Sequence, residues 1–200
     1  MPDFIFDTSK GVYRFAKSRR IVPQKRIDAA VAKVADNATA NLKKLASAFS
    51  QGQISLPTWY LESTDQIRAA HRAVSMIAAG GKTRMAQREW GQVGGRLRSE
   101  LSYFDAFSNQ LGDMELGAAF EARAASYGQA VYATHAQALG KRHEKDGTAA
   151  TESNELDAGA AHCDGCLEAE AAGEVPIGTL TPIGSRECGS RCRCRLVYST

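Results

Sequence analysis

The chain has 200 residues, of which 44% are hydrophobic and 24% charged, with a net charge of +3; this ordinary composition excludes a collagen-like or wholly disordered chain. No apolar run reaches the roughly 18 residues of a transmembrane helix, and the N-terminal segment carries acids where a secretory signal is basic. We therefore expect a protein that is made and kept in the cytoplasm, or in a particle assembled there, without contact to a membrane.

The N-terminal part of the chain is basic, and we interpret residues 1–22 as a basic N-terminal arm. Residues 1–100 carry 17 lysines and arginines against 8 acids, a net charge of +9, whereas residues 101–200 carry 8 against 14, a net charge of −6. The basic excess is sharpest between Lys10 and Lys44. Such a segment can contact phosphate or an acidic protein surface. The simpler interpretation is a solvated helix face and a mobile tail.

Residues 23–140 show helical periodicity, because their apolar residues recur at steps of three and four. This pattern predicts four helices, which run from Pro23 to Phe49, from Pro57 to Ala79, from a Thr83 cap to Phe107, and from Glu115 to Leu139. The positions expected to face inward are Ile27, Val31, Val34, Ala38, Leu42, Leu45, Phe49, Trp59, Ile67, Ala70, Val74, Ile77, Val93, Leu97, Leu101, Phe104, Phe120, Ala124, Tyr127, Val131 and Leu139.

Glycines divide and weaken these helices. Gly52, Gly80 and Gly140 are the expected stops. Three more glycines within residues 91–95 weaken the third helix by roughly 1 kcal/mol each relative to alanine, and they mark a break or a close helix–helix approach. Because many inward positions are alanine, we expect an elongated bundle or arm rather than a thick globule.

Residues 141–160 are polar, acidic and small, without periodicity, which predicts an acidic linker or a segment that wraps on a partner. Residues 161–200 contain all five cysteines together with two prolines and five glycines. The expected fold is therefore mainly α: an elongated helical bundle or arm with a small C-terminal zinc-knuckle lobe that contains short strands.

The cysteines are the most specific signal in the chain. Cys163 and Cys166 form a C-x-x-C turn, and Cys192 and Cys194 point to one face of an extended segment because they are two residues apart. Two such pairs of cysteines can supply the four ligands of a tetrahedral zinc. Cys163 and Cys166 are the first candidates, followed by two of the remaining three. The complete set of candidate donors is Cys163, Cys166, Cys188, Cys192, Cys194 and His162, which exceeds the four positions of one zinc.

Two other interpretations of the cysteines are disulfides and free thiols. The expected cytoplasmic context and the C-x-x-C turn favour zinc over both, and a thioredoxin-type redox motif needs a βαβ context that this sequence does not have. The lobe has few large apolar residues, so a structural Zn²⁺ would supply much of its folding free energy.

Four arginines lie among the cysteines of the C-terminal segment. A zinc knuckle with arginines can bind nucleic acid or an acidic protein surface, including the chain's own residues 144–174. We favour self-pairing or plain solvation. These arginines are Arg186, Arg191, Arg193 and Arg195.

Nothing in the sequence assembles a catalytic constellation, so we expect no enzyme. The motifs G-x-S-x-G and H-E-x-x-H do not occur. His71 and His135 lie on expected helices, where a surface or hydrogen-bonded role is more common than a catalytic base.

The C-terminal pattern H-C-D-G-C, P-I-G-T-L-T-P-I-G and C-G-S-R-C-R-C-R-L-V-Y resembles the cysteine-rich tail of phage head morphogenesis proteins, the Mu F-like minor head protein family of tailed bacteriophages. Residues 52–60, 71–81 and 88–98 resemble the helical part of such proteins. The resemblance covers roughly residues 50–198, and the tail is its most specific part.

The resemblance implies a structural minor head protein that acts with capsid or portal proteins in head assembly and in DNA packaging or ejection. Such a protein would reside in the virion, assemble in the host cytoplasm and form homo-oligomers within a symmetric assembly; packaged DNA is a candidate partner of the basic segment. Family tails often read H-P-x-C-R-C, and here Cys188 stands near the place of that histidine. This departure leaves open which of the cysteines is the last zinc ligand. The alternative is a zinc-dependent nucleic-acid-binding protein.

Overall fold

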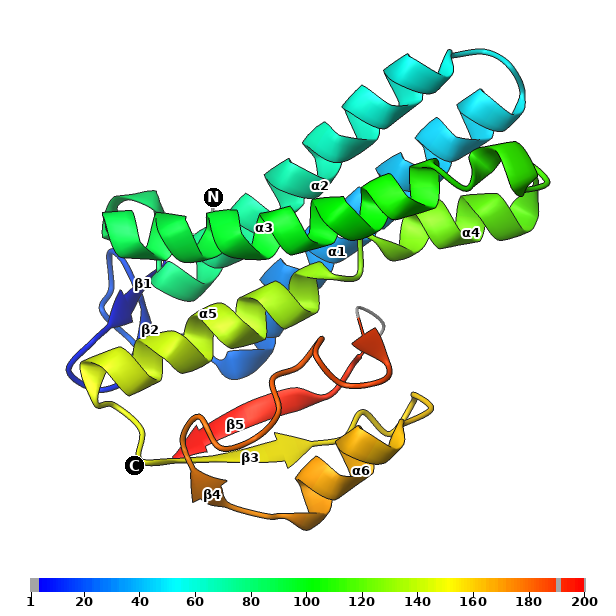
Figure 1. Cartoon of the computed structure of the whole chain (residues 1–200). Coiled ribbons are helices and arrows are strands. Elements are labelled where there is room, and N and C mark those ends of the chain that lie inside the picture. Colours follow the sequence, from blue (N-terminus) through cyan, green and yellow to red (C-terminus); the bar gives the residue numbers. More distant parts are fainter. Residues whose placement is uncertain (1–3, 190–191, 200) are drawn as a thin grey trace.

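The computed structural model describes residues 4–189 and 192–199, and it is mainly helical with short antiparallel strands near the C-terminus (Figure 1). This confirms the expected fold class. The helices are α1 (Gln24–Ser50), α2 (Leu56–Ala79), α3 (Gln87–Ser108), α4 (Ala118–Ser126), α5 (Val131–Asp146) and α6 (Asp164–Ala171), with 3-10 turns at Lys82–Arg84 and Leu111–Asp113. The strands are β1 (Phe4–Asp7), β2 (Val12–Phe15), β3 (Thr151–Glu155), β4 (Val175–Pro176) and β5 (Arg195–Ser199).

The long helices pack side by side, and α5 separates them from a C-terminal lobe (Figure 1). Within the part of the chain that the structure describes, none of the helices has the length and apolar character that crossing a bilayer requires. The apolar stripes predicted for the first two helices are confirmed, because α1 and α2 bury them against each other and against their neighbours. The end predicted for the second helix is also confirmed, since Gly80 caps α2 in the left-handed conformation.

Aromatic side chains fill the core between α1, α2, α3 and α4. Trp59 is fully buried, and its ring centroid lies 5.2 Å from that of Phe104, 5.5 Å from that of Phe120 and 5.5 Å from that of Phe49. Large rings at such distances contribute more free energy per residue than alanine contacts do. The bundle is therefore held by this cluster as well as by close alanine packing.

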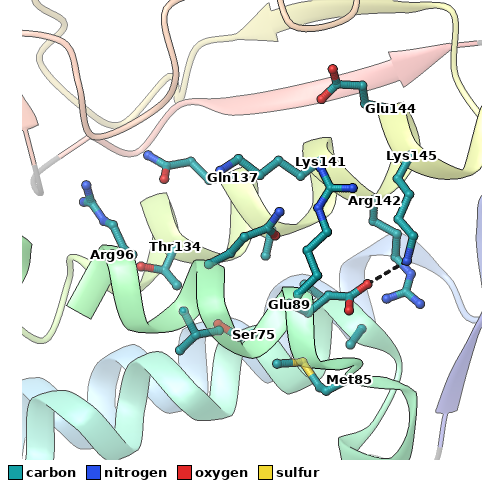
Figure 2. Close-up of a pocket in the computed structure, with 16 residues that line it drawn as sticks. Ser75, Met85, Glu89, Arg96, Thr134, Gln137, Lys141, Arg142, Glu144 and Lys145 are labelled. Carbon is teal, nitrogen blue, oxygen red and sulfur yellow. Dashed lines mark hydrogen bonds and ion pairs between the residues drawn. The ribbon is translucent and has the colours of Figure 1, made fainter. Parts of the chain in front are cut away.

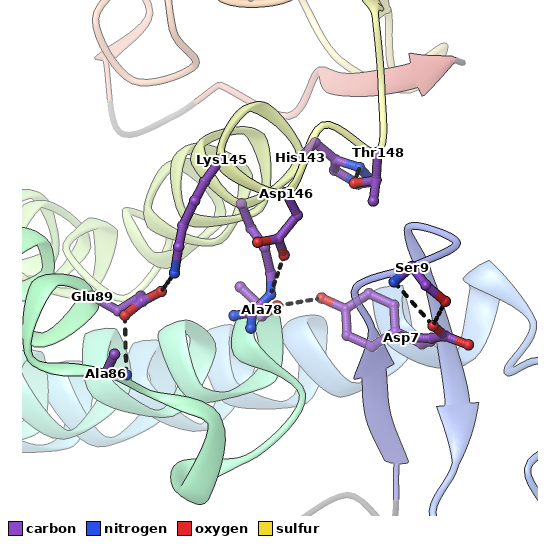
Figure 3. Close-up of polar contacts among 11 residues, drawn as sticks. Asp7, Ser9, Ala78, Ala86, Glu89, His143, Lys145, Asp146 and Thr148 are labelled. Atoms are coloured by element: carbon purple, nitrogen blue, oxygen red, sulfur yellow. Dashed lines mark hydrogen bonds and ion pairs between the residues drawn. The ribbon is translucent and has the colours of Figure 1, made fainter.

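The N-terminal segment forms a hairpin, so for its described part the expectation of a free arm is wrong. β1 and β2 pair antiparallel from Phe4↔Phe15 to Asp7↔Val12. The side chains of Phe4, Phe6 and Tyr13 are buried, because the alternation of apolar residues turns one face of the hairpin onto α1 and α2. The Tyr13 hydroxyl donates a hydrogen bond of 3.0 Å to the Ala78 carbonyl at the end of α2 (Figure 3).

The third helix begins later than expected. Residues 82–84 form a 3-10 turn, and α3 starts at Gln87, where the Glu89 carboxylate accepts a 3.0 Å hydrogen bond from the Ala86 N–H and a 2.9 Å bond from Lys145 of α5 (Figure 3). This carboxylate, rather than Thr83, satisfies the free N–H group at the start of the helix. The glycines within residues 91–95 neither break α3 nor contact a neighbouring helix.

The expected fourth helix is two helices. α4 and α5 are separated at Gly128, where a Cβ atom would lie 2.4 Å from the backbone nitrogen of Thr39, so the chain turns where it meets α1. Gly140 does not stop α5, which ends at Asp146 and is capped by Gly147 in the left-handed conformation. A Cβ at Gly140 would lie 2.6 Å from the Tyr198 hydroxyl, so this glycine allows β5 to approach the helix.

Residues 141–160 are not a linker. α5 continues to Asp146, and Thr151–Glu155 form β3, the central strand of a sheet with the order β4-β3-β5. The inward-facing residues of β3 are the polar Glu152 and Asn154, and hydrogen bonds within the lobe satisfy both. A strand with polar inward positions has no hydrophobic period, which is why the sequence pattern did not predict it.

His71 and His135 are buried inside the bundle. The Nδ1 atom of His71 on α2 lies 2.7 Å from the Thr134 hydroxyl on α5, and His135 is 9% exposed. Burial lowers the pKa of each histidine to about 4, with a smaller contribution at His71 from the charge of Arg96. Both side chains are therefore neutral core residues at pH 7.

These histidines make the bundle less stable in mild acid. Their pKa values are depressed in the folded state, so between pH 6.5 and pH 4 the unfolded chain binds protons that the folded chain excludes. We expect the free energy of unfolding to fall by about 2 kcal/mol per histidine from pH 7 to pH 5. Urea unfolding followed by circular dichroism measures this loss, and the His71→Gln/His135→Gln variant should lose much less. An equal loss in both proteins would contradict the assignment.

Candidate metal centre

The C-terminal lobe has a core that consists largely of cysteines. β3 pairs antiparallel with β4 on one side and with β5 on the other, and α6 packs on β3. Cys166, Cys192 and Cys194 are buried together with Ile183, and this small cluster contacts Ala133 of α5. The lobe therefore contains few apolar side chains of ordinary size that could hold it together without its thiols.

The C-x-x-C turn positions two sulfurs at the start of α6. Cys163 is the N-cap residue, and its carbonyl accepts a 3.0 Å hydrogen bond from the Cys166 N–H. The Sγ atoms of these two residues lie 3.4 Å apart. The Cys166 Sγ also lies 3.6 Å from the Sγ of Cys188 and 3.6 Å from that of Cys192.

All five cysteines lie within the described residues, none of them is in a disulfide, and they converge on Cys166. The sulfurs of Cys163, Cys166 and Cys188 lie within 4.8 Å of one another, and so do those of Cys166, Cys192 and Cys194. The arrangement is therefore able to hold a metal ion. The structure brings together every cysteine that the sequence analysis named.

His162 lies at the edge of the same cluster. Its Nδ1 atom is 3.7 Å from the Cys194 Sγ. The cluster thus contains each sulfur and nitrogen donor that the sequence analysis considered, and more of them than the four ligands of one tetrahedral ion.

Arg186 is a charged partner of the cluster. It is only 6% exposed, and its guanidinium donates to the Asn154 side chain at 2.8 Å and to the Cys166 sulfur at 3.7 Å. Asn154 also donates to the Cys166 carbonyl at 3.2 Å. The arginine and the asparagine therefore fix the turn that carries Cys166.

The thiols differ in acidity because of these contacts. Burial opposes ionisation of Cys166, but hydrogen bonds from Arg186 and from neighbouring thiols prevail and lower its pKa to about 6. Burial, with hydrogen bonds and charge from other thiols, raises the pKa of Cys188 and raises that of Cys194 to about 12. A metal ion that binds this cluster must therefore displace protons from several thiols.

The other arginines of the lobe are used differently. Arg195 forms ion pairs with Glu155 of β3 and, at 3.9 Å, with Asp28 of α1. This agrees with the favoured self-pairing, since Glu155 lies in the acidic stretch. Arg193 is exposed, and Arg191 lies outside the described residues.

β5 attaches the lobe to the rest of the fold. The Tyr198 ring stacks on His143 of α5 with centroids 4.7 Å apart, and the Tyr198 hydroxyl donates to the Ala136 carbonyl at 3.3 Å. His143 also contacts Phe6 of the hairpin edge-on, at 5.5 Å, and its Nδ1 lies 2.9 Å from the Thr148 hydroxyl. The N-terminal hairpin, the helical bundle and the C-terminal lobe therefore contact one another at His143.

A polar cavity of about 450 Å³ lies between α3 and α5 (Figure 2). Several of its cations are neutralised by nearby acids. Arg96 pairs with Glu100 at 2.5 Å, and Lys145 pairs with Glu89 at 2.9 Å. We therefore assign no ligand to this cavity.

Comparisons with known proteins identify no relative of this chain. A scan against models of protein families, a search of curated proteins and a search of solved structures each returned no match to this chain.

Metal binding by this cluster should depend most on Cys166, because it is the member common to both groups of sulfurs. We expect the Cys166→Ser variant to retain less than half of the metal that the wild-type chain binds after reconstitution, measured by elemental analysis. The matched control is Leu167→Ser, which alters the next residue of α6, a side chain that is 45% exposed and outside the cluster. Equal metal content in all three proteins would contradict the assignment.

Proposed function

We propose that this protein is a structural minor head protein of a tailed bacteriophage, bound to capsid or portal proteins and stapled at its C-terminus by zinc. The observation that carries the proposal is the convergence of the five cysteines of the tail in one cluster around Cys166. These cysteines belong to the motif on which the resemblance to Mu F-like minor head proteins depends most.

Zinc is the ion that fits the donor set best. It favours thiolate and imidazole ligands in closed tetrahedral sites. Its bonds to sulfur are near 2.3 Å, so sulfurs that share one zinc lie about 3.8 Å apart. The separations of 3.4 and 3.6 Å around Cys166 are close to this value. When bound, the ion would replace the missing apolar core and hold α6 against β3.

The exposed basic residues of the first half of the chain favour an acidic partner. Arg26, Lys33 and Lys44 are exposed on α1, and steps of seven and eleven residues place them on one face of the helix. Such a face attracts an acidic capsid or portal surface or the phosphates of packaged DNA.

The alternative, a zinc-dependent nucleic-acid reader, loses support from the positions of the arginines. Arg186 is buried against the thiols, and Arg195 pairs with acids of its own chain. Among the described arginines of the lobe, only Arg193 is exposed and without a hydrogen bond or ion pair to the rest of the chain.

The proposal predicts that the chain is a component of assembled particles. Mass spectrometry of purified, crosslinked virions of the phage that encodes it should detect this chain, with crosslinks from Lys33 or Lys44 to capsid or portal protein and between copies of the chain. A chain that is abundant in the infected cell but absent from intact heads would contradict the proposal. Binding of isolated protein to DNA that is lost in the Arg193→Ala variant would instead support the alternative.

A further inference from the structure

The donor atoms of the cluster do not surround a single point evenly. Cys163 and Cys188 belong to one triad of sulfurs, Cys192 and Cys194 belong to the other, and Cys166 is common to both. In a single tetrahedral zinc site, each of four sulfurs is a neighbour of the other three. Two triads that share one member are instead the pattern of two adjacent ions with a common ligand.

We propose that the lobe binds a pair of zinc ions bridged by the thiolate of Cys166, an inference that rests on the proposed zinc-stapled lobe. One ion lies among Cys163, Cys166 and Cys188, and the other among Cys166, Cys192 and Cys194. A thiolate sulfur has several lone pairs, so it can serve two ions at once.

A fourth donor is available to each ion. His162 supplies the second ion, since its Nδ1 atom lies 3.7 Å from the Cys194 sulfur. Glu187 supplies the first, because its carboxylate lies against the Cys163 thiol and accepts a 3.1 Å hydrogen bond from the Gly165 N–H. A Cβ at Gly165 would lie 2.8 Å from that carboxylate, so this glycine leaves room for it.

The number of donors agrees with a pair of ions. Two tetrahedral ions have eight coordination positions, and seven donor residues fill them when Cys166 counts twice. If four of the five thiols bound a single zinc, the fifth thiol would have no role, and neither would His162 or Glu187. The buried guanidinium of Arg186, 3.7 Å from the Cys166 sulfur, offsets negative charge at the shared ligand.

The stoichiometry of the full-length chain tests this inference. Native mass spectrometry after reconstitution with zinc should find two ions per chain, and the Cys194→Ser and His162→Ala variants should retain one. The matched control is Asp164→Asn, an exposed acid beside Cys163 that is outside the donor set, and it should retain two.

Cadmium-113 NMR provides a second readout that does not depend on a variant. Two cadmium resonances that are coupled to each other through the shared sulfur are expected in the wild-type chain. One ion per chain, or two uncoupled resonances, would overturn the bridged pair while leaving a structural zinc lobe intact. A chain that binds no zinc would overturn both the pair and the zinc staple of the proposed function.

Discussion

The lobe of this protein depends on the convergence of five thiols at Cys166. Sulfur atoms occupy the centre where an ordinary small domain would bury leucine, valine or phenylalanine, and Ile183 is the large apolar side chain buried beside them. Thiols alone bury little apolar area, and a domain of this size needs a staple of another kind. A metal ion would supply that staple, because ligand binding would then become part of the folding free energy. The polar strand β3 and the buried Arg186 are explained by the same centre, since both hold the turn that carries Cys166.

The bundle in turn gives the lobe a fixed place to dock. α5 contacts the bundle through α1 and α2 and presents Ala133, Ala136 and Gly140 to the lobe, so that Tyr198 of β5 reaches the helix surface. His143 connects this contact to the N-terminal hairpin through Phe6. The first and last strands of the chain thus meet across one helix. In the proposed role, this connection would transmit the position of the lobe to the helices that contact other head proteins.

The helices and the cysteine cluster could be predicted from the sequence, because each follows a local pattern. The stripe from Ile27 to Leu42 has the helical period, and the C-x-x-C turn and the alternation of Cys192 and Cys194 place sulfurs by short-range geometry. The features that were missed depend on tertiary contacts. Asn154 faces inward because Arg186 lies opposite it, and the break at Gly128 is set by the approach of Thr39. The β1–β2 hairpin was not predicted, because its alternation of apolar residues is short and lies within a basic segment.

Amide hydrogen exchange of the full-length chain, with and without a zinc chelator, tests the central claim most directly. If the metal is the core of the lobe, chelation should abolish protection of the backbone N–H groups in β3, β5 and α6, while the amides of α1 and α2 stay protected. Unchanged protection of β3 and β5 after complete removal of the metal would contradict the account, because it would show that the thiols hold the lobe together without an ion.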